Sequence, residues 1–296
     1  MFLKSLIKYG RLQIEDYNGY VYNFGSNGPF CKIKLHEKFT KRKIFFNPEL
    51  KVGELFVDEK LTIEKGNLEN FIDIITKNQA NIQKSFYHYL FYFISSNLNY
   101  LIQKNYIKSS KRNAEHHYDI DESIYKLFLD KDMQYSCAYF HNPNMSLDQA
   151  QIDKKNHIIN KLQINENMKV LDIGSGWGGM AIDIAKTTGA TVKGITLSEN
   201  QYTTATKRAH EEGLSDKVSF VLQDYRHEQD IYDRIVSVGM FEHVGVGYFK
   251  VFFKKTYELL NEGGIFLLHT IGQRGKPTAT SPWLRKYIFP GGYVPS

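Results

Sequence analysis

One stretch, VLDIGSGWGG at residues 170–179, limits the fold of this chain more than any other segment. An apolar strand runs into glycines, and the glycines run into the start of a helix. Residues without a Cβ let the backbone approach a ligand closely, and the NH groups of a helix N-terminus attract negative charge. Gly174, Gly176 and Gly179 also satisfy the spacing of a dinucleotide-binding loop. The stretch therefore predicts a small-molecule site at the end of a strand.

Two features of the neighbouring sequence disfavour a nicotinamide enzyme. Asp172 lies inside the strand, where a dehydrogenase usually has an apolar residue. The second strand ends Thr-Leu-Ser at residues 196–198, without the acidic residue that would bind the ribose of NAD.

Strand and helix patterns alternate after Glu115. Ser146 and Gln149 form a capping box, which predicts a helix to about Gln163 with Ala150, Ile158, Ile159 and Leu162 facing inward. Strands are predicted at 169–174, 191–197, 218–223, 234–238 and 264–271, and helices at 180–188, 199–212 and 246–261. This alternation indicates a parallel sheet with helices on both faces.

The first 75 or so residues read as short strands and turns. Asn18-Gly19 within LQIEDYNGYVYNFG predicts a hairpin. CKIKLHEKF, KIFF and ELFVDEKLTIEKG are further strand-like runs. The basic residues between Lys32 and Lys43 are interpreted either as a solvated strand face or as a contact with anionic lipid. An aromatic segment at 86–102 has helical spacing, and it either is buried in protein or lies against a lipid surface.

Composition excludes several classes of protein. With 42% hydrophobic and 24% charged residues, the chain is globular, and 296 residues suit about two domains. Two cysteines cannot form a disulfide framework, and the ten histidines show no metal-binding spacing, so we expect no metal. No signal peptide is expected. A net charge of +6 with 14% aromatic residues fits an anionic partner or an aromatic core.

Seven motifs in order carry a family resemblance. They are YSCAYF (135–140), VLDIGSGWGG (170–179), GITLS (194–198) with Gln201, LQDYR (222–226), FEHVG (241–245), HTIG (269–272) and KYIFPGG (286–292). The Asp-x-Gly-x-Gly loop resembles motif I of class I S-adenosylmethionine methyltransferases, and the whole series resembles cyclopropane-fatty-acyl-phospholipid synthases. The resemblance implies a Rossmann-like α/β domain at 113–296 after a small N-terminal domain, mainly β or α+β and lipid-binding-like, at 1–112.

The resemblance also implies a reaction. A methyl group passes from S-adenosylmethionine to a cis double bond of a phospholipid acyl chain, and loss of a proton from that methyl closes a cyclopropane ring. Aromatic faces would stabilise the intervening carbocation. In this family a bound bicarbonate is thought to accept the proton, held by residues that match Cys137, Glu242, His269 and Ile271. His243 is expected to be structural.

The resemblance assigns the cofactor to residues at the ends of several strands. They are Tyr135, Ser136, Asp172, Gly174, Gly176, Thr196, Leu197, Gln201, Asp224, Tyr225 and Arg226. Asp224 could accept a hydrogen bond from the adenine amine. Tyr225 and Arg226 either join the site or face solvent.

Other readings stay open. The chain could be a related C- or N-methyltransferase acting on another lipid or a small amine, or a lipid-binding module that is catalytically incomplete. The expected location is cytoplasmic, at the inner face of a membrane with anionic phospholipid as partner, as a possible homodimer. Nucleic acid is not expected, because the basic residues cluster in the N-terminal third, away from the cofactor motif.

Relatives in this family continue past the PGG motif, so we expect a C-terminally truncated chain whose sheet lacks its last strands. The chain should then be weakly active or inactive, because a tyrosine that completes the bicarbonate pocket is expected in the missing part. Turnover is measured for this chain and for a form with the C-terminal segment restored. The restored form should be faster, and equal turnover would contradict the expectation.

Overall fold

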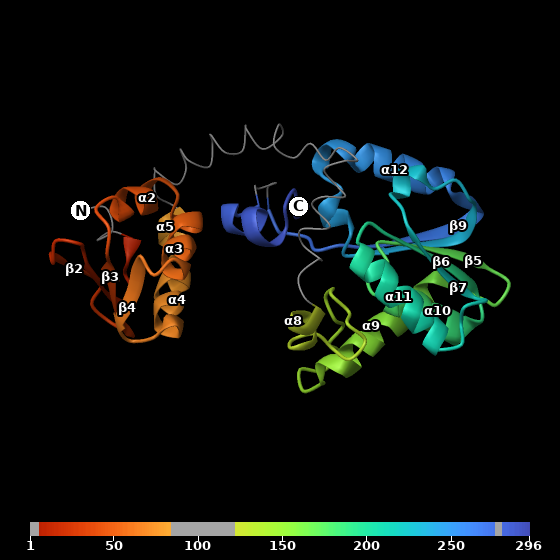
Figure 1. Cartoon of the computed structure of the whole chain (residues 1–296), viewed down its shortest axis with the longest axis horizontal. Coiled ribbons are helices and arrows are strands. Elements are labelled where there is room, and N and C mark those ends of the chain that lie inside the picture. The colour runs from red at the N-terminus through yellow and green to blue at the C-terminus, as the bar shows by residue number, and fades with distance from the viewer. Residues whose placement is uncertain (1–5, 84–121, 276–279) are drawn as a thin grey trace. The chain divides into compact units, whose positions relative to one another are not determined.

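The computed structural model describes residues 6–83, 122–275 and 280–296 (Figure 1). The chain divides into two compact units: Met1–Asn99 with Ser281–Lys286, and Tyr100–Thr280 with Tyr287–Ser296. The predicted domain boundary near residue 112 and the aromatic segment at 86–102 lie outside the described residues.

The first unit contains a sheet of four strands in the order β2-β1-β3-β4. The strands are β1 (Arg11–Glu15), β2 (Val21–Phe24), β3 (Phe30–Leu35) and β4 (Leu61–Lys65). β1 and β2 are antiparallel around the Asn18-Gly19 turn, which confirms the predicted hairpin. β1 and β3 are parallel, and β3 and β4 are antiparallel. The helices are α2 (Thr40–Phe46), α3 (Pro48–Val57), α4 (Leu68–Lys77) and α5 (Gln79–Gln83).

Two of the strand-like runs in this unit were wrongly interpreted from the sequence. KIFF lies in α2, and ELFV lies in α3. Short apolar runs of this kind fit a strand and one turn of a helix equally well. Pro48 occupies the first turn of α3, where its missing NH costs nothing, and Leu55 packs into the core with Ile33. The basic run is divided accordingly: Lys32 and Lys34 lie on β3, and both form ion pairs with Glu15 of β1.

The second unit contains a sheet of five parallel strands in the order β7-β6-β5-β8-β9. The strands are β5 (Lys169–Ile173), β6 (Thr191–Thr196), β7 (Val218–Leu222), β8 (Tyr232–Val238) and β9 (Leu260–His269). All five predicted strands are thereby confirmed, although β9 begins earlier than expected. The early start shortens the helix predicted at 246–261 to α12 (Phe249–Glu258).

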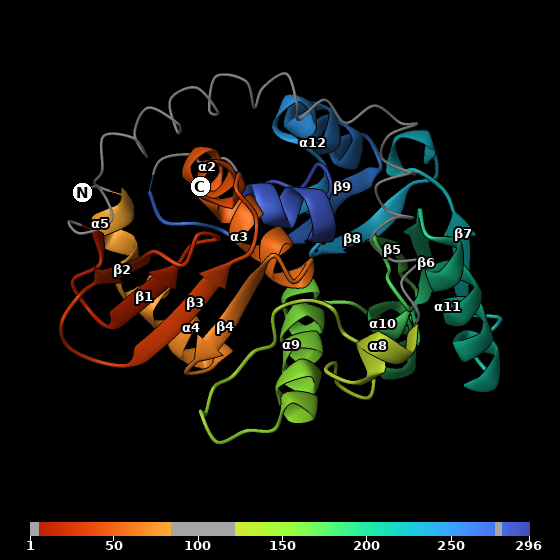
Figure 2. The ribbon, with the colours of Figure 1, turned by 60° about the vertical axis from the view of Figure 1, so that its left-hand side comes forward.

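Helices cover both faces of this sheet (Figures 1 and 2). On one face Val170, Val192 and Val236 pack against α9 (Leu147–Leu162), α10 (Gly179–Thr188) and α11 (Glu199–Glu211). On the other face Leu171 and Ile235 pack with α12. Alternate residues of one strand serve the two cores because side chains of a strand point in opposite directions in turn.

The capping box that was predicted for α9 is confirmed. The Ser146 hydroxyl accepts a hydrogen bond from the Gln149 NH at 3.2 Å, and Gln163 ends the helix with a φ of 50°. Ala150, Ile158, Ile159 and Leu162 are buried as predicted. None of the described helices combines the length and the apolarity that a bilayer span requires. Because all five strands run the same way, their carboxyl ends meet at one edge of the sheet, where a ligand site is expected.

Candidate active site

The loop after β5 leaves space that side chains would fill. Gly174 has a φ of 83°, and a Cβ there would lie 2.7 Å from the Cβ of Met240. Gly176 has a φ of 55°, and a Cβ there would meet nothing within 4 Å. The NH groups of Gly174 and Ser175 both donate to the Ile195 carbonyl, which ties the loop to β6. The first glycine is therefore required by packing, and the second faces open space.

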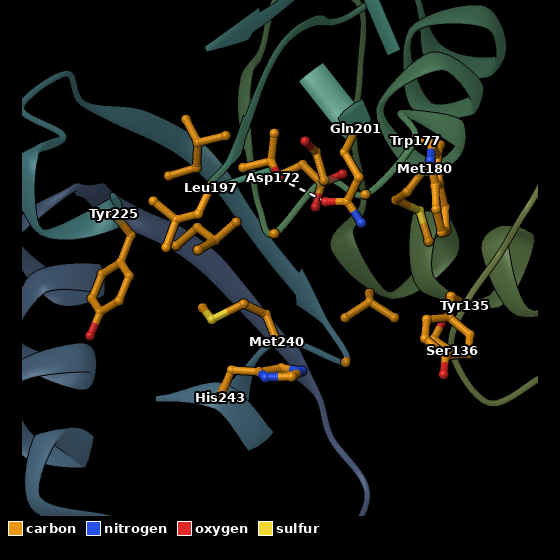
Figure 3. A pocket seen from close by; sticks show the side chains of 18 of the residues that line it. Tyr135, Ser136, Asp172, Trp177, Met180, Leu197, Gln201, Tyr225, Met240 and His243 are labelled. Carbon is orange, nitrogen blue, oxygen red and sulfur yellow. Dashed lines mark hydrogen bonds between the residues drawn. The ribbon is translucent and has the colours of Figure 1, made fainter. Parts of the chain in front are cut away.

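One pocket at this edge is lined by every residue that the sequence assigned to the cofactor (Figure 3). These residues come from a loop before α9, from the ends of β5, β6 and β7, and from the start of α11. They are Tyr135, Ser136, Asp172, Gly174, Gly176, Thr196, Leu197, Gln201, Asp224, Tyr225 and Arg226. Their role toward a cofactor stays a prediction, but the fold brings them all to one place.

Asp172 is a strongly perturbed group of the pocket. Its side chain is only 2% exposed, and its Oδ2 atom has no hydrogen-bond partner in the part of the chain that the structure describes. Burial raises the pKa of this carboxyl to about 7, although the charge of Lys154 opposes the shift. A buried acceptor without a partner costs free energy, so this atom is poised to receive a donor from a ligand.

The end of β6 orients Gln201 toward the pocket. The Thr196 hydroxyl donates to Gln201 Oε1 at 2.8 Å (Figure 3). The Ser198 hydroxyl accepts from the Gln201 NH at 3.2 Å. Ser198 is thus the N-cap of α11. Because the amide oxygen of Gln201 is engaged, its amide nitrogen is the group that can donate to a ligand.

The end of β7 presents a fixed ion pair. Arg226 Nε donates to Asp224 Oδ1 at 2.8 Å, and a second guanidinium nitrogen, Nη2, donates to Oδ2 at 2.6 Å. Both oxygens of Asp224 are therefore engaged, and a ligand amine would have to share them with Arg226. Burial raises the pKa of Tyr225 to about 12, so this phenol stays protonated. Of the two readings for Tyr225 and Arg226, the structure favours the pocket wall over solvent.

Sequence reasoning did not assign several other residues of the wall. They are Met133, Gln134, Trp177, Met180, Met240, His243 and Pro290. Trp177 is 2% exposed, and its indole NH donates to Asn200. The position of Trp177 inside the glycine motif could have predicted its place on the pocket wall. His243 was expected to be structural, yet it lies on the pocket wall, and burial lowers its pKa. The direction of the His243 side chain is set by the short turn Phe241–His243. A turn of three residues has no hydrophobic periodicity from which a side-chain direction could be predicted.

The predicted catalytic residues lie outside the wall of this pocket, and three of them are brought together. Glu242 is buried, and its Oε1 atom accepts a hydrogen bond from the Ile271 NH. The carbonyl of His269 accepts from the Gly239 NH at 3.0 Å. Glu242 Oε2 and His269 Nδ1 are buried atoms without a hydrogen-bond partner among the described residues. Cys137 is exposed, and no hydrogen bond described here joins it to the other three.

Burial also lowers the pKa of His269, with the charge of Lys154 acting in the same direction. The imidazole is therefore neutral near pH 7 and can accept or donate a proton. Within the described ranges no group of His, Cys, Asp and Glu side chains could hold a metal ion.

The fold and the pocket define the class. A parallel sheet that carries an Asp-x-Gly-x-Gly loop after its central strand is the Rossmann-like fold of class I S-adenosylmethionine-dependent methyltransferases. A family model described as mycolic acid cyclopropane synthetase matches residues 105–296. The chain belongs to that family. Residues 2–86 match a second family model, which is described only as a domain of unknown function.

Curated relatives agree with this assignment. The chain is 45% identical over 183 residues to the cyclopropane-fatty-acyl-phospholipid synthase of Escherichia coli, covering 62% of this chain and 47% of that protein. It is 42% identical over 187 residues to a probable fatty acid methyltransferase of Pseudomonas putida, covering 61% and 48%. The aligned part thus spans about half the length of these relatives.

Solved structures show the same relationship. A cyclopropane synthase from Mycobacterium tuberculosis has 32% identity and a TM-score of 0.59, covering 63% of this chain and 70% of that one. A mycolic acid cyclopropane synthase solved with SAH and CTAB has 33% identity and a TM-score of 0.58, with the same coverage.

The raised pKa of Asp172 predicts how stability depends on pH. The folded protein holds this proton more tightly than the unfolded chain, which releases it near pH 4. As the pH rises from about 4 to about 7, the unfolded chain loses the proton first, so the free energy of unfolding falls and stays lowered above that window.

Asp172→Asn removes this titration. The variant should be more stable than the unmodified ligand-free protein above about pH 5. This advantage in the free energy of unfolding should grow by roughly 3 kcal/mol between pH 5 and pH 8. Urea unfolding at several pH values measures the difference. Asp216→Asn, at an exposed site of the same unit, is the control and should give a constant difference. A constant difference for Asp172→Asn as well would refute the shift.

Proposed function

We propose that this chain is the part of an enzyme that transfers a methylene from S-adenosylmethionine to the cis double bond of an unsaturated phospholipid acyl chain. The product is a cyclopropane ring. The observation that carries the proposal is the convergence of all the assigned cofactor residues on one pocket, in a chain that belongs to the cyclopropane synthetase family. The solved relative with SAH supports the choice of cofactor.

The pocket fits such a cofactor. S-Adenosylmethionine supplies an electrophilic methyl group and leaves as S-adenosylhomocysteine. The open space at Gly176 would admit the methionine part against bare backbone, and the unpartnered Oδ2 atom of Asp172 would accept a donor from it. Gln201 and the Asp224–Arg226 pair would bind the ribose and the adenine.

The residues around Glu242 fit a bound bicarbonate, which would supply the proton acceptor. Glu242 Oε2 and His269 Nδ1 are buried atoms whose hydrogen-bonding capacity is unused within the described chain. The Ile271 NH, which was expected to help hold the bicarbonate, donates to Glu242 Oε1. Ile271 therefore fixes the carboxylate in place, and Glu242 Oε2 and His269 Nδ1 are the atoms that would hold the anion.

An aromatic cluster lies next to Glu242. The Phe241 and Phe249 rings stack with centroids 4.3 Å apart, and Phe252 and Phe253 lie within 5.5 Å of Phe241. Phe241 and Phe252 are buried, and the faces of such rings would favour the carbocation that forms when an alkene accepts a methyl group.

Glu242→Gln should separate chemistry from cofactor binding. Because Glu242 lies outside the pocket wall, the variant should bind S-adenosylhomocysteine as tightly as the unmodified protein. Cyclopropane formation should fall by about 100-fold or more, since proton removal loses its held base. Vesicles of monounsaturated phospholipid are incubated with S-adenosylmethionine and with this chain or its C-terminally extended form. Mass spectrometry then counts acyl chains that have gained one CH2.

Each alternative function gives its own result. Unchanged unsaturated chains with labelled methyl on another lipid or amine would replace the proposal by a different methyltransferase. A lipid-binding module would show no binding of S-adenosylmethionine by calorimetry. Full activity of Glu242→Gln would refute the role of that carboxylate.

We further propose that the N-terminal unit docks on an anionic phospholipid surface at the inner face of a membrane. Phe39, Phe45 and Phe46 at α2 are all more than half exposed. Lys38 precedes them, and Arg42 lies over the Phe46 ring at 5.7 Å. Exposed rings can insert at a lipid interface, and basic side chains beside them are attracted to anionic headgroups. Each basic residue at the surface contributes ~1 kcal/mol to the binding free energy.

Vesicle sedimentation tests this docking. The chain should bind vesicles that contain phosphatidylglycerol more tightly than pure phosphatidylcholine vesicles, and added salt should weaken the binding. Arg42→Gln should reduce affinity about fivefold, which corresponds to ~1 kcal/mol. Phe45→Ala should reduce it as well, whereas Tyr257→Ala, at an exposed ring of the other unit, should not. Equal binding to both kinds of vesicle would refute the proposal.

A further inference from the structure

The buried face of α9 carries three polar side chains. Gln151, Lys154 and Lys155 are each only 3% exposed. They face the segment 130–136, here called the strap, whose residues Met133–Ser136 form one wall of the cofactor pocket. Lysine is almost never buried to this degree without a partner, so the polar contacts of these side chains explain why they can be buried.

Two of the three side chains hold the strap in place. Gln151 Nε2 donates to the carbonyls of Gln134 at 3.1 Å and Ser136 at 2.9 Å. Lys155 forms ion pairs with Asp132 at 2.6 Å and with Asp183 of α10 at 2.5 Å. Gln151 thus bonds to the backbone of the strap, and the charge of Lys155 is compensated by two carboxylates. These contacts account for the position of the strap.

Lys154 is different because its partners are neutral. Its ammonium donates to Ser136 Oγ at 2.7 Å and to Gln134 Oε1 at 2.9 Å, and no ion pair found among the described residues includes it. An ammonium group can only donate, so both oxygens must accept. Gln134 consequently donates through Nε2 to Asp132 Oδ2 at 2.9 Å. Ser136 likewise accepts from Lys154, and its own hydroxyl proton is left for a third atom.

We propose that Lys154 is a positioning residue that directs the hydroxyl proton of Ser136 into the cofactor pocket, toward the carboxylate of the methionine part of the cofactor. Lys154 does not line the pocket, so it acts through Ser136, which does. Its positive charge also favours an anionic group at that end of the pocket. The inference rests on the proposed function, since the ligand is S-adenosylmethionine or its product.

The surroundings of Lys154 make this device sensitive to pH. Burial lowers the pKa of Lys154 to about 8. The titratable groups that face it are Asp130 and Asp132 of the strap, Lys155 of α9, Cys137, Asp172 of β5 and His269 of β9. Above the pKa the neutral amine can accept a hydrogen bond, and the Ser136 hydroxyl can turn back toward it. Cofactor affinity should therefore fall as the pH rises through about 8 and beyond.

Calorimetry with S-adenosylhomocysteine tests the inference between pH 6.5 and pH 9.5. At pH 7, Lys154→Met should weaken binding about 10- to 100-fold, as expected for a lost charge-assisted hydrogen bond. Ser136→Ala should weaken it similarly, and the double variant should add little, because both changes remove one interaction. Either variant should also lose the fall in affinity near pH 8. The amino group of the ligand titrates equally for all proteins, so the differences between the profiles are compared.

Lys161→Met, at an exposed lysine of the same helix, is the matched control and should keep the profile of the unmodified protein. If Lys154→Met does not fold by circular dichroism, the profile of Ser136→Ala decides. Unmodified affinity and pH dependence in either variant would overturn the role of Lys154. Failure of the unmodified chain to bind S-adenosylhomocysteine at any pH would instead overturn the proposed cofactor.

Discussion

The rest of the second unit depends on how β5 is paired. β6 lies on one side of β5 and β8 on the other, so the chain reverses its direction of progress across the sheet at this strand. Loops that leave β5 and β8 at such a point diverge and leave a crevice between them. Gly174 lies there, against Met240 at the end of β8. The loop after β5 can therefore open onto a pocket without breaking the hydrophobic packing of either face.

Several polar groups of this unit are buried without compensation within the described protein. Asp172 Oδ2, Glu242 Oε2 and His269 Nδ1 lack hydrogen-bond partners there, and the ammonium of Lys154 has only neutral ones. Each such atom costs free energy in the folded protein. Ligands that supply the missing partners recover this free energy on binding, so the same atoms that weaken the fold favour the bound state.

Much of this arrangement could be predicted from the sequence. The five parallel strands and the cap at Ser146 follow from patterns that local chemistry imposes, whereas the assigned pocket residues were expected from the family resemblance. KIFF could not be placed, because four residues do not separate a strand from a helix, and packing within its own unit decides. His243 and Lys154 were missed for a related reason. Nothing in their neighbourhood along the chain shows that a turn directs His243 to the pocket wall, or that Lys154 lies on a buried helix face beside the strap.

Lys154 also shows why the two groups of site residues need not act independently. The strap that it contacts ends at Ser136, on the pocket wall, and Cys137 follows directly in the chain. The charge of Lys154 acts on Asp172, which we propose contacts the cofactor, and on His269, which we propose helps to hold the proton acceptor. A change in the strap or in this one charge therefore reaches both groups. The same buried lysine that orients a cofactor contact also helps to keep His269 neutral, the state in which an imidazole can take up a proton.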